Sequence, residues 1–315
     1  MQNYITIGEI IRHYRTEQHM SQEALANGIC DRKYISKIET NKQIPTLDMV
    51  NQLSERLGVN LYENYSLMLE HVNIETHKRI EELNKHFCRE GYVQLQTLIE
   101  EYQDLPEFQH GVPFLTLEYA KSLFLAWRKN DFKAATEVLY QALLHENIHI
   151  DHWNPSHKLS NTALVLINSL ATNHCRLHDY TQGQRYLDFL MTYIDNFFHK
   201  NHFATNRNNQ FELGFAALIT YNHFVFFHNK EIVSCAKIDE LLSLLKSLHS
   251  HRFLPELLLC KTYLLADDGN MDDARKLYNT AHCFGTYLYG EKYQKHIEET
   301  ILAQHLPIFN TCQPS

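Results

Sequence analysis

The sequence predicts an all-α protein with two helical domains. Apolar residues recur at helical spacing along the chain, and only 10 Gly and 7 Pro interrupt its 315 residues. The hydrophobic content of 44% is ample for packed cores, and the length fits two domains of about 100–200 residues each. Helical patterns are short and closely punctuated up to about residue 70, so we place the domains at 1–68 and 75–306.

Charge and targeting features narrow the class of protein. The start, MQNYITIGEIIRHYR, lacks the features of a signal peptide, and no apolar run approaches the ~20 residues of a membrane span. We therefore expect a cytoplasmic protein. The seven cysteines form no C-x-x-C pair and are odd in number, which favours reduced thiols. A formal net charge of −8 disfavours non-specific coating of nucleic acid, so any DNA contact must be local.

The first domain contains four predicted short helices. The first carries Ile7, Ile10, Ile11 and Tyr14 at helical spacing. Ser21 is expected to cap a second helix that runs to Asn27 and is followed by Gly28, and Asp31 is expected to cap a third. The fourth follows Thr46 and ends at Gly58, with its apolar face formed by Leu47, Val50, Leu53 and Leu57. Four short helices with a tight turn between the second and third form a helix-turn-helix unit.

The third helix is the predicted DNA-reading element. Tyr34, Ile35 and Ile38 lie on its apolar face. The opposite face carries the side chains expected on bases or phosphates: Arg32, Lys33, Ser36 and Lys37. The residues expected to hold the DNA backbone are Gln22, Thr40, Asn41 and Lys42. Because Asp31 and Glu39 flank this face, a merely solvated helix or a protein-binding helix remains the alternative.

A known family resembles this segment. The run SQEALANGICDRKYISKIETNKQIPTLDMVNQLSERLGV is similar to the Xre-type helix-turn-helix of phage repressors and many bacterial regulators. The features that match in order are Gln22, Ala26, Gly28, the Ile35 and Ile38 pair, Glu39 and Pro45. The resemblance implies that the partner is double-stranded operator DNA.

Helix pairs recur after about residue 75. Examples are YAKSLFLAWRKNDFKAATEVLYQAL, LINSLATNHCRLHDYTQGQRYLDFLM and LLLCKTYLLADDGNMDDARKLYNTA, which look like degenerate tetratricopeptide repeats (TPR). The breaks fall near Gly91, Asp131, Asp179, Asn229 and Gly269, a period of about 40–50 residues. Five such pairs and a C-terminal helix at 286–305 would stack into a right-handed TPR-like α-solenoid, whose concave face suits an extended peptide.

The whole arrangement resembles the PlcR and Rgg branch of the RRNPP-type peptide-pheromone receptors of Gram-positive bacteria. The resemblance implies a quorum-sensing homodimer without a cofactor, whose repeat groove binds an imported signalling peptide. In that family, asparagines on the inner repeat helices bind the peptide backbone. Asn173 in SLATNHCRL and Asn222 in LITYNHFVF match in context, and Tyr119 and Lys261 occupy broadly similar places in the flanking repeats.

Two alternatives stay open for the second domain. Either asparagine could be a buried amide that ties one helix to the next. The repeats could also bind a protein partner instead of a free peptide, which an exposed apolar patch would favour. The sequence alone does not define the peptide, the operator or the sign of regulation.

One motif suggests an enzyme. His145, Glu146 and His149 fit the H-E-x-x-H pattern of zinc proteases, which holds two imidazoles one helical turn apart. The motif runs into HIDHWNP, where we expect the helix to end, and no third ligand follows at short spacing. With 21 histidines in the chain a chance match is unsurprising. We therefore expect no catalytic activity and no metal site.

Overall fold

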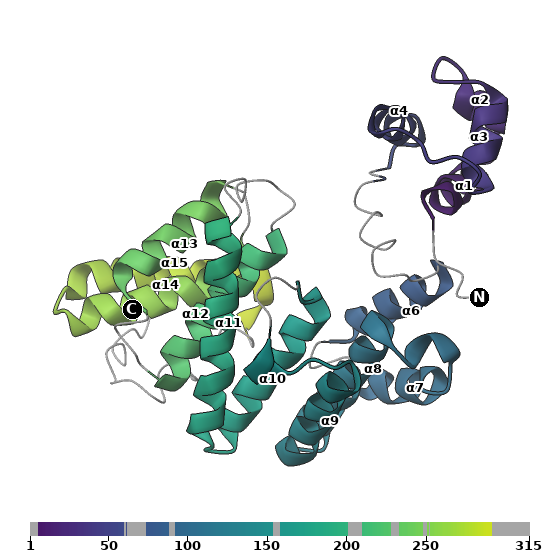
Figure 1. Ribbon diagram of the computed structural model, residues 1–315. Coiled ribbons are helices and arrows are strands. Elements are labelled where there is room, and N and C mark those ends of the chain that lie inside the picture. The colour runs from purple at the N-terminus through teal and green to yellow at the C-terminus, as the bar shows by residue number, and fades with distance from the viewer. Residues whose placement is uncertain are drawn as a thin grey trace. The chain divides into compact units, whose positions relative to one another are not determined.

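The computed structural model describes most of the chain as helix (Figure 1). The described residues are 6–59, 61, 74–87, 92–153, 158–200, 210–227, 233–247, 251 and 253–291. All regular structure among them is helical, which confirms the predicted all-α class. The chain divides into two compact units, Met1–Asn130 and Asp131–Ser315. This division falls inside the range predicted for the repeat domain, and the limits 1–68 and 75–306 stay predictions.

Four helices form the N-terminal domain, as predicted: α1 (Ile7–Glu17), α2 (Gln22–Ala26), α3 (Arg32–Glu39) and α4 (Leu47–Leu57). Their apolar faces pack together in one core. This packing stabilises the four helices, since each is too short to be stable alone. The buried members of that core are Ile10, Ile11, Leu25, Ala26, Ile35, Ile38, Val50, Leu53, Leu57 and Leu61.

Capping groups set where these helices begin. Thr6 and Glu9 form a reciprocal capping box at α1, which the sequence reading missed. Ser21 and Thr46 accept backbone N–H groups at the starts of α2 and α4, as predicted. The prediction for Asp31 is wrong in one respect. It occupies the N-cap of α3, but its side chain forms no capping hydrogen bond, and its backbone carbonyl holds the first turn instead.

The rest of the first unit consists of α6 (Ile74–Lys85), α7 (Tyr92–Tyr102), the 3-10 turn η2 (Pro106–Phe108), α8 (Gly111–Leu123) and the π-helical turn η3 (Phe124–Arg128). Polar contacts tie the first three together. The Tyr102 hydroxyl donates to Glu82 at 2.7 Å, and Arg79 pairs with Glu107 at 2.5 Å while lying over the Tyr102 ring. These contacts fix α6 and α7 around a shared apolar core.

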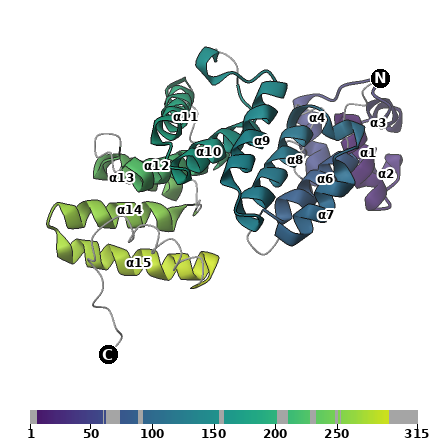
Figure 2. The same cartoon turned by 90° about the horizontal axis from the view of Figure 1, so that it is seen from below.

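The second unit contains α9 (Phe132–His145), the 3-10 turn η4 (Ile150–His152), α10 (Asn161–Arg176), α11 (Tyr180–Lys200), α12 (Gln210–Phe227), α13 (Cys235–Ser247), α14 (Leu254–Asp267) and α15 (Met271–Tyr289). Helices α10 and α11 pack as a pair, and α14 and α15 lie side by side (Figure 2). α12 contacts α10, α11, α13 and α14. Contacts on so many sides explain why α12 is apolar around nearly its whole circumference.

Three of the predicted repeat breaks are confirmed. Asp131 caps α9 by accepting the Ala134 N–H at 2.9 Å, Asp179 lies between α10 and α11, and Gly269 separates α14 from α15 with φ +81°. The breaks near Gly91 and Asn229 lie outside the described residues. The predicted C-terminal helix at 286–305 is wrong at its start, because α15 continues unbroken to Tyr289; residues 292–305 are not among those described.

Close packing between α10 and α11 depends on Gly183. A Cβ atom there would collide with the Cys175 sulfur and lie 3.1 Å from the Ala171 carbonyl oxygen. The cysteines that the structure describes are free thiols, and Cys175 and Cys260 are buried. None of the described helices combines the length and apolar character required of a membrane span.

Candidate functional site

Helix α3 is held firmly against the domain core. Ile35 and Ile38 are fully buried on its inner face. On the other side of that contact, Gly8 brings α1 so close that a Cβ would strike the Ile38 carbonyl oxygen. The position of α3 is therefore fixed by backbone contact as well as by side-chain packing.

A buried ion pair between Arg15 and Glu39 joins α1 to the end of α3. Glu39 accepts hydrogen bonds from Arg15 Nε at 2.6 Å and Arg15 Nη2 at 2.9 Å, and its side chain is only 2% exposed. Arg15 Nη1 also donates to the Met20 carbonyl at 2.7 Å. The hydrogen bond to Glu39 raises the pKa of Arg15. This network joins α1, the turn before α2, and the end of α3.

The predicted base-contacting residues lie on the outer face of α3. Arg32, Lys33 and Lys37 are exposed, and Ser36 is half-buried. None of the three cations forms an ion pair with a residue that the structure describes, so no described residue neutralises their charge. An α-helix with its side chains is about 10–12 Å in diameter, which fits the width of the DNA major groove.

The four residues predicted to hold the DNA backbone differ in their environment. Gln22 donates to Glu39 Oε2 at 2.8 Å, which occupies one of its two amide N–H groups. The Thr40 hydroxyl donates to the Ser36 carbonyl, and Lys42 is exposed. Asn41 has φ +59°, and its Oδ1 accepts from the Thr6 hydroxyl. Gln22, Asn41 and Lys42 each keep at least one side-chain donor, whereas the single hydroxyl donor of Thr40 is used within the helix. The DNA contacts of all four stay predictions.

Sequence reasoning missed the structural role of Arg15 and Glu39. A signal was present, because Glu39 follows Ile35 by four positions and therefore shares the core-facing side of the helix. A carboxylate at such a position is tolerated only with a partner. The distant Arg15 had no comparable local signal.

The predicted peptide-binding asparagines lie on the first helices of successive pairs in the second unit, Asn173 on α10 and Asn222 on α12. Both are buried. The Asn173 side chain forms no hydrogen bond with any other residue that the structure describes. Asn222 Nδ2 donates to Asn168 Oδ1 at 2.8 Å, so this amide does tie α12 to α10. Its carbonyl oxygen is not used in that bond.

Asn168 was not identified from the sequence. It is buried on α10 between apolar neighbours in the run LVLINSLA. An amide in an otherwise apolar run is a sequence signal for a buried hydrogen bond. Its partner, 54 positions later, could be named only from the fold.

A buried histidine lies beside Asn222. The ring of His223 is fully buried, with Nε2 3.8 Å from an oxygen of Asp188 on α11. Burial lowers the pKa of His223, although Asp188 acts in the opposite direction. Burial therefore favours the neutral form of the His223 ring.

The two flanking candidates have other contacts. Tyr119 lies on α8 in the first unit, with its ring edge-on to Phe87 at 5.0 Å. Lys261 lies on α14 in the second unit, with Nζ 2.5 Å from Asp239 Oδ1 on α13. The Lys261 charge is thus already paired. Ligand contacts by either residue stay predictions.

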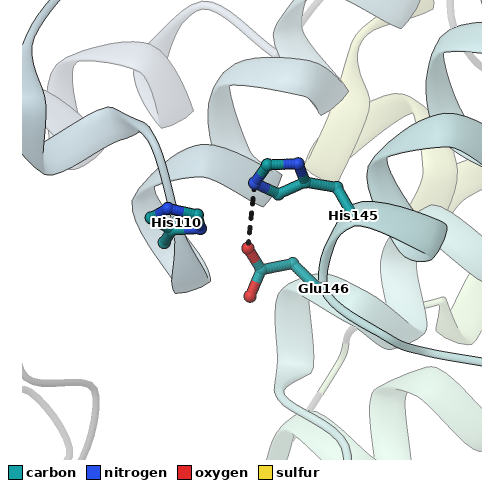
Figure 3. Close-up of side chains that lie close together, drawn as sticks. All are labelled: His110, His145 and Glu146. Atoms are coloured by element: carbon teal, nitrogen blue, oxygen red, sulfur yellow. Dashed lines mark ion pairs between the residues drawn. The ribbon is translucent and has the colours of Figure 1, made fainter.

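The H-E-x-x-H segment does not lie on one helix. α9 ends at His145, Glu146 is its C-cap, and Asn147 has φ +56°. His149 follows in extended conformation before η4. Glu146 and His145 lie next to each other, with 4.0 Å between Oε1 and Nε2 (Figure 3). The rigid helical turn that a zinc protease needs between the two imidazoles is absent from this described segment.

The chain was compared with known protein families, with curated proteins and with solved structures. Residues 11–64 match the HTH_3 helix-turn-helix family. No curated protein matches the chain in sequence. PlcR from Bacillus thuringiensis, solved in complex with the peptide PapR7 and DNA, has 13% identity and a TM-score of 0.60, covering 93% of this chain and 98% of that chain.

Two other solved receptors share the fold. The SHP pheromone receptor Rgg2 from Streptococcus dysgalactiae has 13% identity and a TM-score of 0.54, covering 95% of this chain and 100% of that chain. ComR from S. thermophilus, in complex with DNA and its signalling peptide ComS, has 19% identity and a TM-score of 0.53, covering 96% and 100%.

These comparisons assign a helix-turn-helix segment to residues 11–64 and show that the fold of the chain matches that of solved peptide-pheromone receptors. The resemblance to PlcR and Rgg receptors predicted from the sequence is confirmed at the level of the fold. The predicted order, a helix-turn-helix domain followed by TPR-like helical repeats, is confirmed as well.

Proposed function

We propose that this protein is a cytoplasmic quorum-sensing transcription regulator that acts as a homodimer. It binds operator DNA through α3 and a short signalling peptide through the inner helices of its repeats, without a cofactor or catalytic activity. The observation that carries the proposal is the pair of buried asparagines on successive repeat helices, in a fold shared with receptors solved with peptides. Ligand binding then shifts the protein between arrangements with different DNA affinity.

The DNA interface is tested at Arg32 and Lys37, which are exposed and unpaired among described residues. We expect Arg32→Ala and Lys37→Ala each to weaken operator binding by about 1–3 kcal/mol if they contact bases. Anisotropy titrations on an operator selected from random duplexes measure this. Lys78→Ala, an exposed lysine on α6, is the control. Wild-type affinity in both test variants would remove α3 from the interface.

The peptide site is supported by the chemistry of the asparagine amide. An amide donates and accepts hydrogen bonds, so it can pair with a peptide backbone regardless of side chain. Asn173 has a buried amide without a hydrogen bond to a described residue, and Asn222 retains a carbonyl oxygen.

We expect the double change Asn173→Ala with Asn222→Ala to abolish the response to peptide while leaving operator affinity unchanged. Calorimetric titration with short synthetic peptides encoded beside the gene measures peptide affinity, and the DNA assay above checks the other domain. Asn279→Ala, an exposed residue on α15, is the control. Undiminished peptide affinity in the double variant would remove these asparagines from the site.

A second candidate is a regulator whose repeats bind a protein partner. The observation that favours it is the exposure of two aromatic side chains on α15, Phe284 at 44% and Tyr287 at 87%. Exposed apolar groups in contiguous patches mark protein-binding surfaces. If peptides bind neither the wild type nor the double variant, this pair becomes the better-supported surface.

A further inference from the structure

We propose that His223 and Asp188 form a pH-sensitive contact between α11 and α12, so that acidification changes how these two helices pack. Both residues lie in the second unit, and α11 and α12 contact each other directly (Figure 1). The contact itself does not depend on a ligand. Its link to peptide binding rests on the proposed function, because α12 carries Asn222 next to His223.

The His223 ring is buried without a hydrogen bond. Its side chain is fully buried on a predominantly apolar helix, and neither ring nitrogen hydrogen-bonds to a residue that the structure describes. A buried polar group without a hydrogen bond costs free energy, and most such groups have a partner. An apolar side chain of similar size would avoid that cost, so packing alone does not explain a histidine here.

Two groups on α11 beside the ring accept hydrogen bonds. Asp188 Oδ1 lies 3.8 Å from His223 Nε2, and the Leu187 backbone also favours the charged ring. A neutral imidazole has one N–H donor and one acceptor, whereas the protonated ring has two donors. The surroundings therefore match the protonated ring in hydrogen bonding, although burial opposes its charge.

Burial is the larger of these opposing effects and lowers the pKa of His223 below its ordinary value. When a histidine pKa is lower in the folded than in the unfolded protein, the unfolded chain takes up the proton first during acidification. The contribution of His223 to stability is therefore intact above the ordinary histidine pKa of about 6.5 and is lost as the pH falls below it. Acidification thus strains the contact between α11 and α12.

A small movement relieves that strain. An N–H···O hydrogen bond requires about 2.7–3.2 Å between its heavy atoms, so Nε2 and Oδ1 must approach by about 1 Å. The Asp188 side chain is 50% exposed, which leaves its carboxylate free to turn toward the ring. A hydrogen bond between two charged groups is stronger than one between neutral groups. Acidification therefore favours a different packing of α11 against α12.

Among the residues described, Asp188 is the charged group that acts on the ring. On α11, the Tyr180 ring lies edge-on to Phe227, whose own ring is 6.1 Å from that of His223. α12 also packs against α10, α13 and α14. Titratable groups on those three helices contact other residues: His174 with Asp179, Lys237 with Asp195, and Tyr263 with Phe224.

Thermal unfolding of the full-length protein from about pH 8 to about pH 5 tests the contact without a ligand, because histidine changes charge in this range. His223→Leu removes the titrating ring and should be at least as stable as the wild type at the higher pH. On acidification, the melting temperature of the wild type should fall by at least about 2 °C more than that of His223→Leu. His251→Leu, at an exposed histidine of the same unit, is the matched control and should follow the wild type.

A second variant should deviate in the opposite direction. Asp188→Asn keeps the ring but removes the negative charge beside it, so a protonated His223 would lack its partner. Its melting temperature should fall more steeply with acidification than that of the wild type. If His223→Leu does not fold, this variant decides alone, and a wild-type pH dependence in Asp188→Asn would contradict the proposal.

Peptide affinity tests the link to the ligand site. Histidine-free peptides are selected on the wild type at about pH 7.5, from a random eight-residue display library, and resynthesised. Acidification to about pH 5.5 should weaken their binding to the wild type roughly tenfold, because the ligand and the proton favour different packings of α12. In His223→Leu the same acidification should weaken binding less than about twofold.

The possible failures are distinguishable. Parallel melting curves for the wild type, His223→Leu and Asp188→Asn would overturn the pH-sensitive contact. A difference in melting curves together with pH-independent peptide affinity would overturn its link to the ligand site. If no peptide is enriched, the proposed peptide-receptor function fails, whereas the melting curves still decide the contact.

Discussion

Replacing Glu39 by alanine is expected to lower the unfolding free energy of the helix-turn-helix domain by about 3–5 kcal/mol. The change removes the only partner among described residues for Arg15 Nε and Nη2, and Gln22 loses its acceptor. The Arg15 side chain is 12% exposed, so water reaches it poorly. Removing one member of a buried pair is far more costly than losing a surface pair, because a buried charge stays uncompensated.

Amide hydrogen exchange on the full-length protein measures this loss, with faster exchange expected across residues 6–59. Operator binding should fall with it, because the network orients α3. Glu23→Ala is the matched control, since Glu23 is an exposed glutamate on α2 in the same domain and should change stability by less than about 1 kcal/mol. Equal exchange in the two variants would contradict a stabilising role for the Glu39 network.

Gly8→Ala is expected to destabilise the same domain by about 3 kcal/mol. In an ordinary helix position this change would be stabilising by roughly 1 kcal/mol, because alanine is the better helix former. Here the added methyl group collides with the backbone carbonyl oxygen of Ile38, and backbone of a packed helix cannot rotate away as a side chain can. A loss of stability in Gly8→Ala would therefore indicate the close contact between α1 and α3.

Chemical denaturation of the full-length protein, followed by circular dichroism, gives the size of the change. Thr16→Ala provides the reference, because Thr16 is an exposed α1 residue whose hydroxyl bonds only to local carbonyls. A gain in stability for Gly8→Ala would mean that α1 and α3 lie farther apart than described here.

Local signals in the sequence were enough to predict the four N-terminal helices. Caps such as Ser21 and Thr46, and the stop at Gly58, act within one helical turn, so spacing alone reveals them. The repeat breaks at Asp131, Asp179 and Gly269 were found for the same reason. The predicted side-chain cap by Asp31 was wrong. A residue type that is common at the N-cap does not guarantee that its side chain accepts a hydrogen bond from the helix.

The exposed residues of the candidate DNA site could be predicted from the sequence, but the buried partners of the site residues could not. The cationic face of α3 follows from helical periodicity, so its exposed residues were correctly placed on one side. The partners of Glu39 and Asn222 were not predicted, because Arg15 and Asn168 are 24 and 54 positions away and only the packed fold brings them together. A single sequence records that a buried polar residue needs a partner, but not which one.

Peptide and DNA binding measured on the same full-length sample test the central claim most directly. Isothermal titration with short synthetic peptides encoded beside the gene would be done with and without the selected operator duplex. The account predicts tight binding of one peptide whose affinity changes when DNA is present, because coupling between two sites is reciprocal. Intact DNA binding with no peptide bound, or peptide affinity indifferent to DNA, would contradict it.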